Sequence, residues 1–196
     1  MRGNDFLSPP SSDEALWAGI QSGEILALSE LMKRYYRSLV HYGTKFTNDI
    51  ASIEDCLQDL FAGLWRRRAS LPTPPSVKHY LFKSHRNHLF TALQKSSGRQ
   101  AESLLADIPA EELTAEELLI HEETSLATHY KLHNTLSALS ARQREAVHLK
   151  YYENLSYDQI AYVMNINRQS VANLLQQAIR KMRALWQLIG LLLLLQ

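Results

Sequence analysis

The chain has 196 residues, of which 45% are hydrophobic and 21% are charged, and its formal net charge at pH 7 is +1. This composition is typical of a soluble globular protein, and the length allows one large domain or two small ones. The single cysteine, Cys56, excludes an internal disulfide and a metal site built from several cysteines. The N-terminal stretch lacks an apolar signal-peptide core, and the leucine-rich end is shorter than the roughly 20 apolar residues of a spanning helix. We therefore expect a cytoplasmic protein.

The near-neutral charge hides a basic block, an acidic block and a mixed C-terminal part. Residues 60–101 contain Lys and Arg but no Asp or Glu, whereas residues 101–130 contain Asp and Glu but no Lys or Arg. Such an acidic stretch, interrupted by Pro109, is typical of a partly ordered linker between two folded parts.

Helical periodicity runs through the first part. A capping box from Ser11 to Glu14 opens a helix that should end at Gly23. Further helices are predicted at 24–42, 49–67 and 77–94, and the three prolines of "LPTPPS" must separate the last two. One apolar stripe lies on the helix at 49–67, formed by Ile53, Leu57, Leu60, Phe61 and Leu64.

Periodicity returns near residue 125, where two more capping boxes open at Ser140 and Ser156. Nothing reads as a convincing strand. We predict an all-α fold, with two small helical domains joined by an acidic linker, the C-terminal one a helix-turn-helix domain. The predicted boundaries are 10–97 for the first domain, 98–126 for the linker, 127–187 for the second domain and 188–196 for an apolar tail.

The helix-turn-helix pattern lies at 156–186, with Asn165 ending its first helix in a left-handed conformation. Its second helix should bury the stripe Val171, Leu175, Ile179 and Met182. Amides and guanidinium groups can pair with base edges in the major groove, and cations at a helix start can hold phosphate. The candidate DNA contacts are Arg168, Gln169, Ser170, Asn173, Gln176, Arg180 and Lys181. The alternative is a helical hairpin with a solvated basic face and no ligand.

The segment from Leu136 to Arg183 resembles region 4 of the sigma factors of bacterial RNA polymerase. The residues that carry the resemblance are Leu136, Leu139, Arg144, Val147, Leu149, Tyr151, Ser156, Tyr157, Ile160 and Ala161. A helix-turn-helix alone is also compatible with a response-regulator-like protein. The N-terminal part of the chain distinguishes a sigma factor from a response regulator, because "IEDCLQDLFAGLW" at 53–65 resembles the most characteristic stretch of sigma region 2.

Glu54, Asp55, Gln58 and Asp59 are spaced to form an acidic face opposite the apolar stripe. The resemblance implies that this face binds the largest subunit of core RNA polymerase; without it, a solvated acidic face would be the expectation. Cys56 should be packed core.

The helix at 77–94 is similar to the part of region 2 that recognises and opens the promoter element nearest the start site. Cations can hold a DNA backbone and aromatic side chains can cover exposed bases. The candidates are Lys78, Tyr80, Lys83, Arg86 and Asn87, with the "PTPPS" loop as a pocket wall. Tyr80 could equally be a core aromatic residue. The sequence departs from the family pattern at Ser84, His85, Thr91, Ala172 and Gln177, which should alter promoter preference or weaken the grip on DNA.

The resemblance covers about 15–97 and 127–187. Having only regions 2 and 4 points to the extracytoplasmic-function group, in which the linker passes through polymerase channels; a merely soluble spacer is the alternative. The implied partners are core RNA polymerase, promoter DNA and an anti-sigma factor, possibly membrane-anchored. The apolar tail is either a docking strip for that factor or packs on its own domain.

No catalytic constellation is present, so we expect no enzyme activity, no small-molecule substrate and no cofactor. His129 and His133 lack a third ligand nearby in sequence, so no metal site is expected. The rival hypotheses are a stand-alone helix-turn-helix transcriptional regulator that does not join polymerase, and a helical adaptor that binds protein alone.

Overall fold

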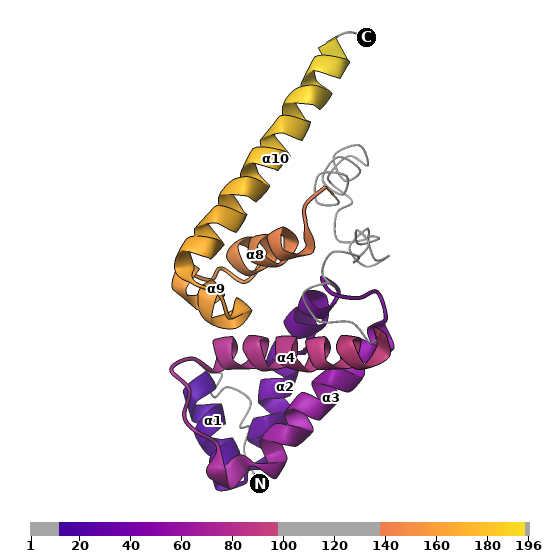
Figure 1. The fold of residues 1–196 in the computed structure, drawn as a ribbon. Coiled ribbons are helices and arrows are strands. Elements are labelled where there is room, and N and C mark those ends of the chain that lie inside the picture. The colour runs from indigo at the N-terminus through magenta and orange to yellow at the C-terminus, as the bar shows by residue number, and fades with distance from the viewer. Residues whose placement is uncertain (1–11, 98–137, 195–196) are drawn as a thin grey trace, which may run out of the picture.

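The computed structural model describes residues 12–97 and 138–194, and every regular element within these two ranges is helical (Figure 1). The first part contains α1 (Asp13–Ser22), α2 (Ile25–Gly43), α3 (Ile50–Arg66), a 3-10 turn η1 (Arg68–Ser70) and α4 (Val77–Ser97). The second part contains α8 (Ala141–Tyr151), α9 (Tyr157–Met164) and α10 (Arg168–Leu194). This confirms the all-helical prediction, while the predicted acidic linker lies outside the described residues.

Local sequence explains where the first helix begins and ends. The Ser12 hydroxyl accepts a hydrogen bond from the Ala15 N–H at 3.2 Å, and Gly23 ends α1 with a positive φ of 92°. A glycine adopts this left-handed conformation without steric cost. The capping box predicted from Ser11 to Glu14 is therefore wrong: Ser12 caps the helix, and the third helical residue is Ala15, whose side chain cannot return the hydrogen bond.

The apolar stripe of α3 forms the centre of the first domain. Ile53, Leu57, Leu60, Phe61 and Leu64 are all buried, as the periodicity predicted. Full burial of such side chains contributes about 1.5–3 kcal/mol each to folding. Helix α2 approaches this stripe closely at Gly43, where an added Cβ would lie only 2.6 Å from Cγ2 of Ile53.

Side chains of α1 hydrogen-bond to the proline-rich loop between η1 and α4. The Trp17 indole donates to the Pro72 carbonyl at 3.1 Å, and the Gln21 amide donates to the Leu71 carbonyl at 2.7 Å. Helix α4 then continues to Ser97, three residues beyond its predicted end at residue 94.

The second domain follows its predicted start and turn signals. Both predicted capping boxes are formed, at Ser140 and at Ser156, and Asn165 ends α9 with the left-handed φ of 55° that the sequence predicted. Helix α10 continues to Leu194, so it runs through residue 188, where the boundary between the second domain and the apolar tail stays a prediction. Its C-terminal part extends away from the other labelled helices (Figure 1).

The two domains contact each other through α4. Helix α9 packs against α4, and α8 lies on the same side of it (Figure 1). Helix α4 therefore belongs to the first domain by sequence and also supplies the surface on which the second domain rests.

Candidate nucleic-acid and protein interfaces

The predicted acidic face is present on α3. Asp55, Gln58 and Asp59 are exposed, whereas Glu54 is half-buried and accepts a hydrogen bond from the Tyr36 hydroxyl at 2.6 Å. Cys56 is buried, as predicted, and burial raises the pKa of its thiol. Three of the four predicted contact residues are thus available to a partner, and the fourth is oriented by α2.

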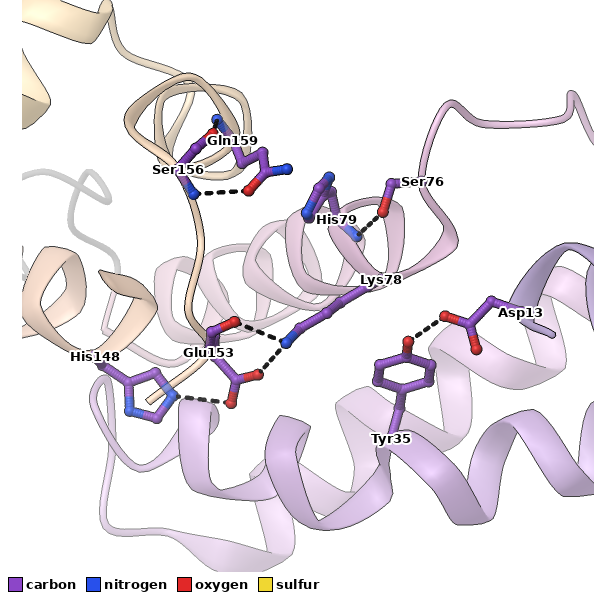
Figure 2. Close-up of polar contacts among 9 residues, drawn as sticks. All are labelled: Asp13, Tyr35, Ser76, Lys78, His79, His148, Glu153, Ser156 and Gln159. Carbon is purple, nitrogen blue, oxygen red and sulfur yellow. Dashed lines mark hydrogen bonds and ion pairs between the residues drawn. The ribbon is translucent and has the colours of Figure 1, made fainter. Parts of the chain in front are cut away.

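The cations of α4 lie on one side of the helix, as their spacing predicted, but that side faces the second domain. The Lys78 ammonium lies 2.9 Å from the Glu153 carbonyl oxygen and 2.9 Å from its Oε2 (Figure 2). The Lys83 ammonium lies 3.9 Å from the centre of the Tyr162 ring, within the range of a cation–π interaction.

Arg86 forms the most buried of these contacts. Its Nε lies 2.7 Å from Oε1 of Glu145 and its Nη2 lies 3.4 Å from Oε2, so the guanidinium meets the carboxylate through two nitrogens. The Glu145 side chain has no exposed surface, and the Tyr42 hydroxyl donates to the same Oε1 at 2.7 Å. Burial lowers the pKa of Arg86, but the Glu145 carboxylate outweighs it and the net pKa is raised.

A second buried cluster joins the domains around His148 and Glu153. The His148 Nε2 lies 3.6 Å from Oε1 of Glu153 (Figure 2). The His148 ring also stacks on that of Tyr152, with ring centres 5.3 Å apart. Burial lowers the pKa of His148 to about 4. Burial raises the pKa of Glu153, yet its contacts with His148 and Lys78 hold the net pKa below the usual value.

The other two candidates on α4 differ in exposure. Tyr80 is half-buried and meets the edge of Trp17 with ring centres 5.2 Å apart, which supports its role as a packing residue. Asn87 is exposed. His85, which departs from the family pattern, is fully buried in the first domain, where burial lowers its pKa to about 4.

Helix α10 presents its polar face to solvent. Gln169, Asn173, Gln176, Arg180 and Lys181 are exposed, while Val171, Leu175 and Ala178 are buried on the opposite side. Gln169 donates to the Asn173 side-chain oxygen at 3.2 Å, which aligns the two amides along the helix. The predicted amide face is therefore available for base contacts.

The start of α10 is organised by residues the sequence reading only partly identified. The Asn167 side chain accepts a hydrogen bond from the Ser170 N–H at 2.7 Å, so it caps the helix. Arg168 is exposed and lies 3.7 Å from the Asp158 carboxylate. An Asn directly before a helix is a recognised capping signal, so Asn167 was identifiable from the sequence.

Sequence reasoning missed the residues that join the two domains, namely Tyr42, Glu145, Glu153 and Tyr162. Glu145 lies in a short helix beside other polar residues, and nothing in the local pattern distinguishes a buried carboxylate from a solvated one. His129 and His133 lie outside the described residues. No helix in the described part of the chain is both long and apolar enough to cross a membrane.

Comparison with known protein families matches both halves of the chain. Residues 31–99 match sigma-70 region 2, and residues 129–182 match sigma-70 region 4. The two matches together cover more than half of the chain, in the order that the sequence predicted.

Curated relatives extend over nearly the same span. The RNA polymerase sigma factor NccH of Alcaligenes xylosoxydans xylosoxydans is 24% identical over 182 residues, which cover 92% of this chain and 98% of the relative. The ECF RNA polymerase sigma factor SigK of Mycobacterium sp. (strain JLS) is 23% identical over 176 residues, which cover 87% of this chain and 88% of the relative.

Two solved structures share the fold. CnrH in complex with the cytosolic domain of CnrY aligns with a TM-score of 0.62 and 19% identity, over 90% of this chain and 98% of that one. The sigma factor RpoE of Bartonella quintana, in complex with the anti-sigma factor NepR, aligns with a TM-score of 0.60 and 19% identity, over 81% of this chain and 96% of that one. With regions 2 and 4 matched and these relatives spanning most of its length, the chain belongs to the extracytoplasmic-function group of the sigma-70 family.

Proposed function

We propose that this chain is a transcription initiation factor that binds core RNA polymerase and directs it to specific promoters. The observation that carries the proposal is the pairing of regions 2 and 4 in one chain. Each domain presents one exposed polar surface suited to a macromolecular partner, on α3 and on α10. The chain itself catalyses no reaction in this proposal, and it acts in the cytoplasm, where polymerase meets DNA.

The exposed face of α3 is the proposed polymerase contact, with Asp55, Gln58 and Asp59 at its centre and Glu54 at its edge. Three acidic or amide side chains lie on one turn and a half of a rigid helix whose other side is anchored in the core. Like charges that face each other across an interface cost several kcal/mol, so the partner surface is expected to be basic.

Two surfaces are proposed for promoter DNA. The α10 face, from Arg168 to Lys181, reads the upstream element, because its exposed amides and guanidinium match base-edge hydrogen-bonding patterns. The α4 residues Lys78, Lys83 and Arg86 hold the downstream element, with Tyr80 and Asn87 near the separated strand.

An inhibitor protein is the further partner we propose. The structural relatives were solved as complexes, CnrH with the cytosolic domain of CnrY and RpoE with the anti-sigma factor NepR. By analogy, an anti-sigma factor, possibly membrane-anchored, would hold this chain inactive until a signal releases it. The apolar end of α10 is a candidate docking strip for that factor, and packing on its own domain is the alternative.

In vitro transcription with purified core polymerase tests the proposal. The full chain is added to core enzyme on genomic fragments, and 5′ ends of the transcripts are mapped. Initiation at defined positions that depends on the chain is the expected result. No specific initiation on any fragment, at low salt and without an inhibitor, would contradict it.

A stand-alone regulator and a protein-only adaptor are separated by two further measurements. A regulator would bind promoter fragments but fail to co-elute with core polymerase in size-exclusion chromatography. An adaptor would co-elute with its protein partner but leave promoter choice unchanged when the α10 amides are removed.

A further inference from the structure

Trp17 and Gln21 reach from one face of α1 to the proline-rich loop that precedes α4. The Trp17 indole donates to the carbonyl oxygen of Pro72 at 3.1 Å, and the Gln21 amide donates to that of Leu71 at 2.7 Å. Side chains at positions i and i+4 of a helix project from the same side. One face of α1 therefore holds two consecutive carbonyl groups that lie 55 and 50 positions further along the chain.

The same amide also contacts a side chain of the loop. The Gln21 amide nitrogen lies 3.4 Å from the hydroxyl oxygen of Thr73, so its two N–H groups serve residues on both sides of Pro72. Trp17 is 1% exposed and Gln21 is half-buried. Because packing fixes both side chains, the donors are held in place against the loop.

The loop has few donors with which to fix its own shape. Three of the six residues in "LPTPPS", at 71–76, are proline, and proline has no backbone N–H. Proline also restricts the residue before it to extended conformations, which disfavours a hydrogen-bonded turn within the loop. The carbonyl groups of the loop therefore need donors from elsewhere, and α1 supplies two of them.

The loop also lies beside the proposed contacts for the downstream promoter element. It leads directly into α4, which carries Lys78 and Tyr80 in its first turn. The rings of Trp17 and Tyr80 pack edge to face, with centres 5.2 Å apart and an angle of 72° between their planes. Trp17 thus fixes the loop through its N–H and the tyrosine through its ring.

The outer surface of the loop has the chemistry to accept a base. Pro72, Thr73 and Pro75 are exposed, whereas Leu71 at the start of the loop is 7% exposed. A base that has left its stack is held by hydrogen bonds to its edge and by apolar groups against its face. Backbone carbonyl groups, a hydroxyl and proline rings provide both kinds of contact.

An unpaired base gains most from a loop that is ordered before it binds. Unstacking the base costs free energy, and ordering a loop during binding adds to that cost. A loop whose shape is already held removes the second cost. Each neutral hydrogen bond that holds it shifts such an equilibrium by about twofold to tenfold.

We propose that Trp17 and Gln21 are positioning residues for the downstream promoter element, which hold the loop at 71–76 in the shape that accepts an unpaired base. Neither side chain touches DNA in this proposal, since both act through the carbonyl groups of Leu71 and Pro72. The inference rests on the proposed function, because it concerns how the same downstream element is held.

The variants Gln21→Met and Trp17→Phe remove the two donors. Methionine has nearly the shape of glutamine without its N–H groups, and phenylalanine keeps an aromatic ring at the buried position. Gln94→Met is the matched control, because Gln94 is exposed near the end of α4 and the chemical change is the same. Circular dichroism and thermal unfolding establish whether each variant folds.

Binding is measured with holoenzyme formed from core polymerase and the full chain. The probe is a fluorescently labelled forked duplex of a promoter mapped in the transcription assay, with the non-template strand unpaired through the downstream element. In a second series of probes, one base of that strand at a time is replaced by an abasic site. The ratio of affinities with and without a base measures what the protein gains from that base.

The wild type should lose at least about fivefold in affinity when the abasic site falls at the captured base. Gln21→Met should reduce this ratio by about twofold to tenfold, and Trp17→Phe should reduce it in the same direction. The affinity for the abasic fork itself should not change, because the loop then has no base to hold. Gln94→Met should match the wild type on every probe.

Three outcomes would overturn the proposal. The first is a wild type that binds every abasic fork as tightly as the complete fork. The second is an unchanged ratio in Gln21→Met. The third is an equal loss of affinity for all forks in the variants, with or without the base, which would show a purely structural role. If Trp17→Phe does not fold, Gln21→Met decides the outcome by the same criteria.

The positioning role and the proposed function fail in different measurements. If the wild type directs specific initiation with core polymerase but the variants keep its ratio of affinities, only the role of α1 is wrong. If the wild type directs no initiation on any fragment, the proposed function is wrong and the positioning role falls with it.

Discussion

At the scale of single residues, His85 has the most consequential environment in the first domain. Its side chain is fully buried, and desolvation lowers its pKa from 6.5 to about 4. Between these two pH values the unfolded chain binds a proton at this position and the folded chain does not. Lowering the pH from 6.5 to about 4 therefore favours unfolding, and the contribution of neutral His85 to stability is fully present above pH 6.5.

We predict that the free energy of unfolding falls by about 2 kcal/mol between pH 7.5 and pH 5 through His85 alone. Replacing His85 by Leu should make the free energy of unfolding at pH 5 and at pH 7.5 more similar by this amount, whatever the substitution does to the stability at pH 7.5. Urea denaturation at both pH values measures it. His88→Asn is the control, because that side chain is only half-buried; an unchanged pH dependence in His85→Leu would contradict the prediction.

Asp55 and Asp59 carry a prediction about partner binding at the same scale. Both are exposed on α3, so replacing them by Lys should leave the fold intact. Placing like charges in an interface costs several kcal/mol, so binding to core polymerase should weaken by at least about a hundredfold. Glu14→Lys with Glu30→Lys, two exposed carboxylates elsewhere in the domain, is the charge-matched control for a polymerase pull-down. Equal binding by both double variants would refute the α3 contact.

At the scale of elements, α10 combines a buried stripe with an exposed amide face. Capping by Asn167 fixes where the helix begins, and Val171, Leu175 and Ala178 fix its rotation against the rest of the domain. These local constraints decide which side chains face outward. The function of the face thus depends on packing that the sequence pattern already indicates.

Replacing Asn173, Gln176 and Arg180 by Ala should remove upstream promoter preference. Each lost contact to a base edge should reduce discrimination by about 1–3 kcal/mol. Arg183→Ala, a neighbouring exposed residue outside the predicted reading face, controls for the loss of a cation. Competition transcription between promoters that differ only in the upstream element measures the effect, and a retained ranking in the triple variant would argue against base reading by α10.

At the scale of the whole molecule, binding to a promoter requires both domains to face DNA at once. Phosphate contacts dominate such affinity and make it steeply salt-dependent. Arg168 and Lys181 lie at exposed positions on α10, where we assign them to phosphate.

Replacing Arg168 and Lys181 by Gln should lower the slope of log affinity against log salt by about two, since each phosphate contact contributes about 0.9. The ranking of promoter sequences should stay the same, in contrast to the triple variant. Filter binding of polymerase holoenzyme at several salt concentrations measures the slope. A slope equal to that of the wild type would show that these cations do not contact phosphate.

The sequence by itself determined the helices, the caps at Ser140, Ser156 and Asn165, and the exposed faces of α3 and α10. These features are encoded locally, by capping side chains such as Ser156 and by the 3.6-residue spacing of apolar positions such as Leu57 and Leu175. Errors in the extent of the helices were confined to their ends, as at Ser12, Ser97 and Leu194.

Only the tertiary structure decided what meets the basic side of α4. Arg86 and Glu145 are separated by 59 positions in the chain, and periodicity carries no information about which distant surfaces meet. A carboxylate also looks the same in sequence whether water or a guanidinium surrounds it. The sequence therefore predicted cations for DNA. In the folded chain Lys78 and Arg86 pair with Glu153 and Glu145, because a buried charge needs a partner of opposite sign, and Lys83 lies on the ring of Tyr162.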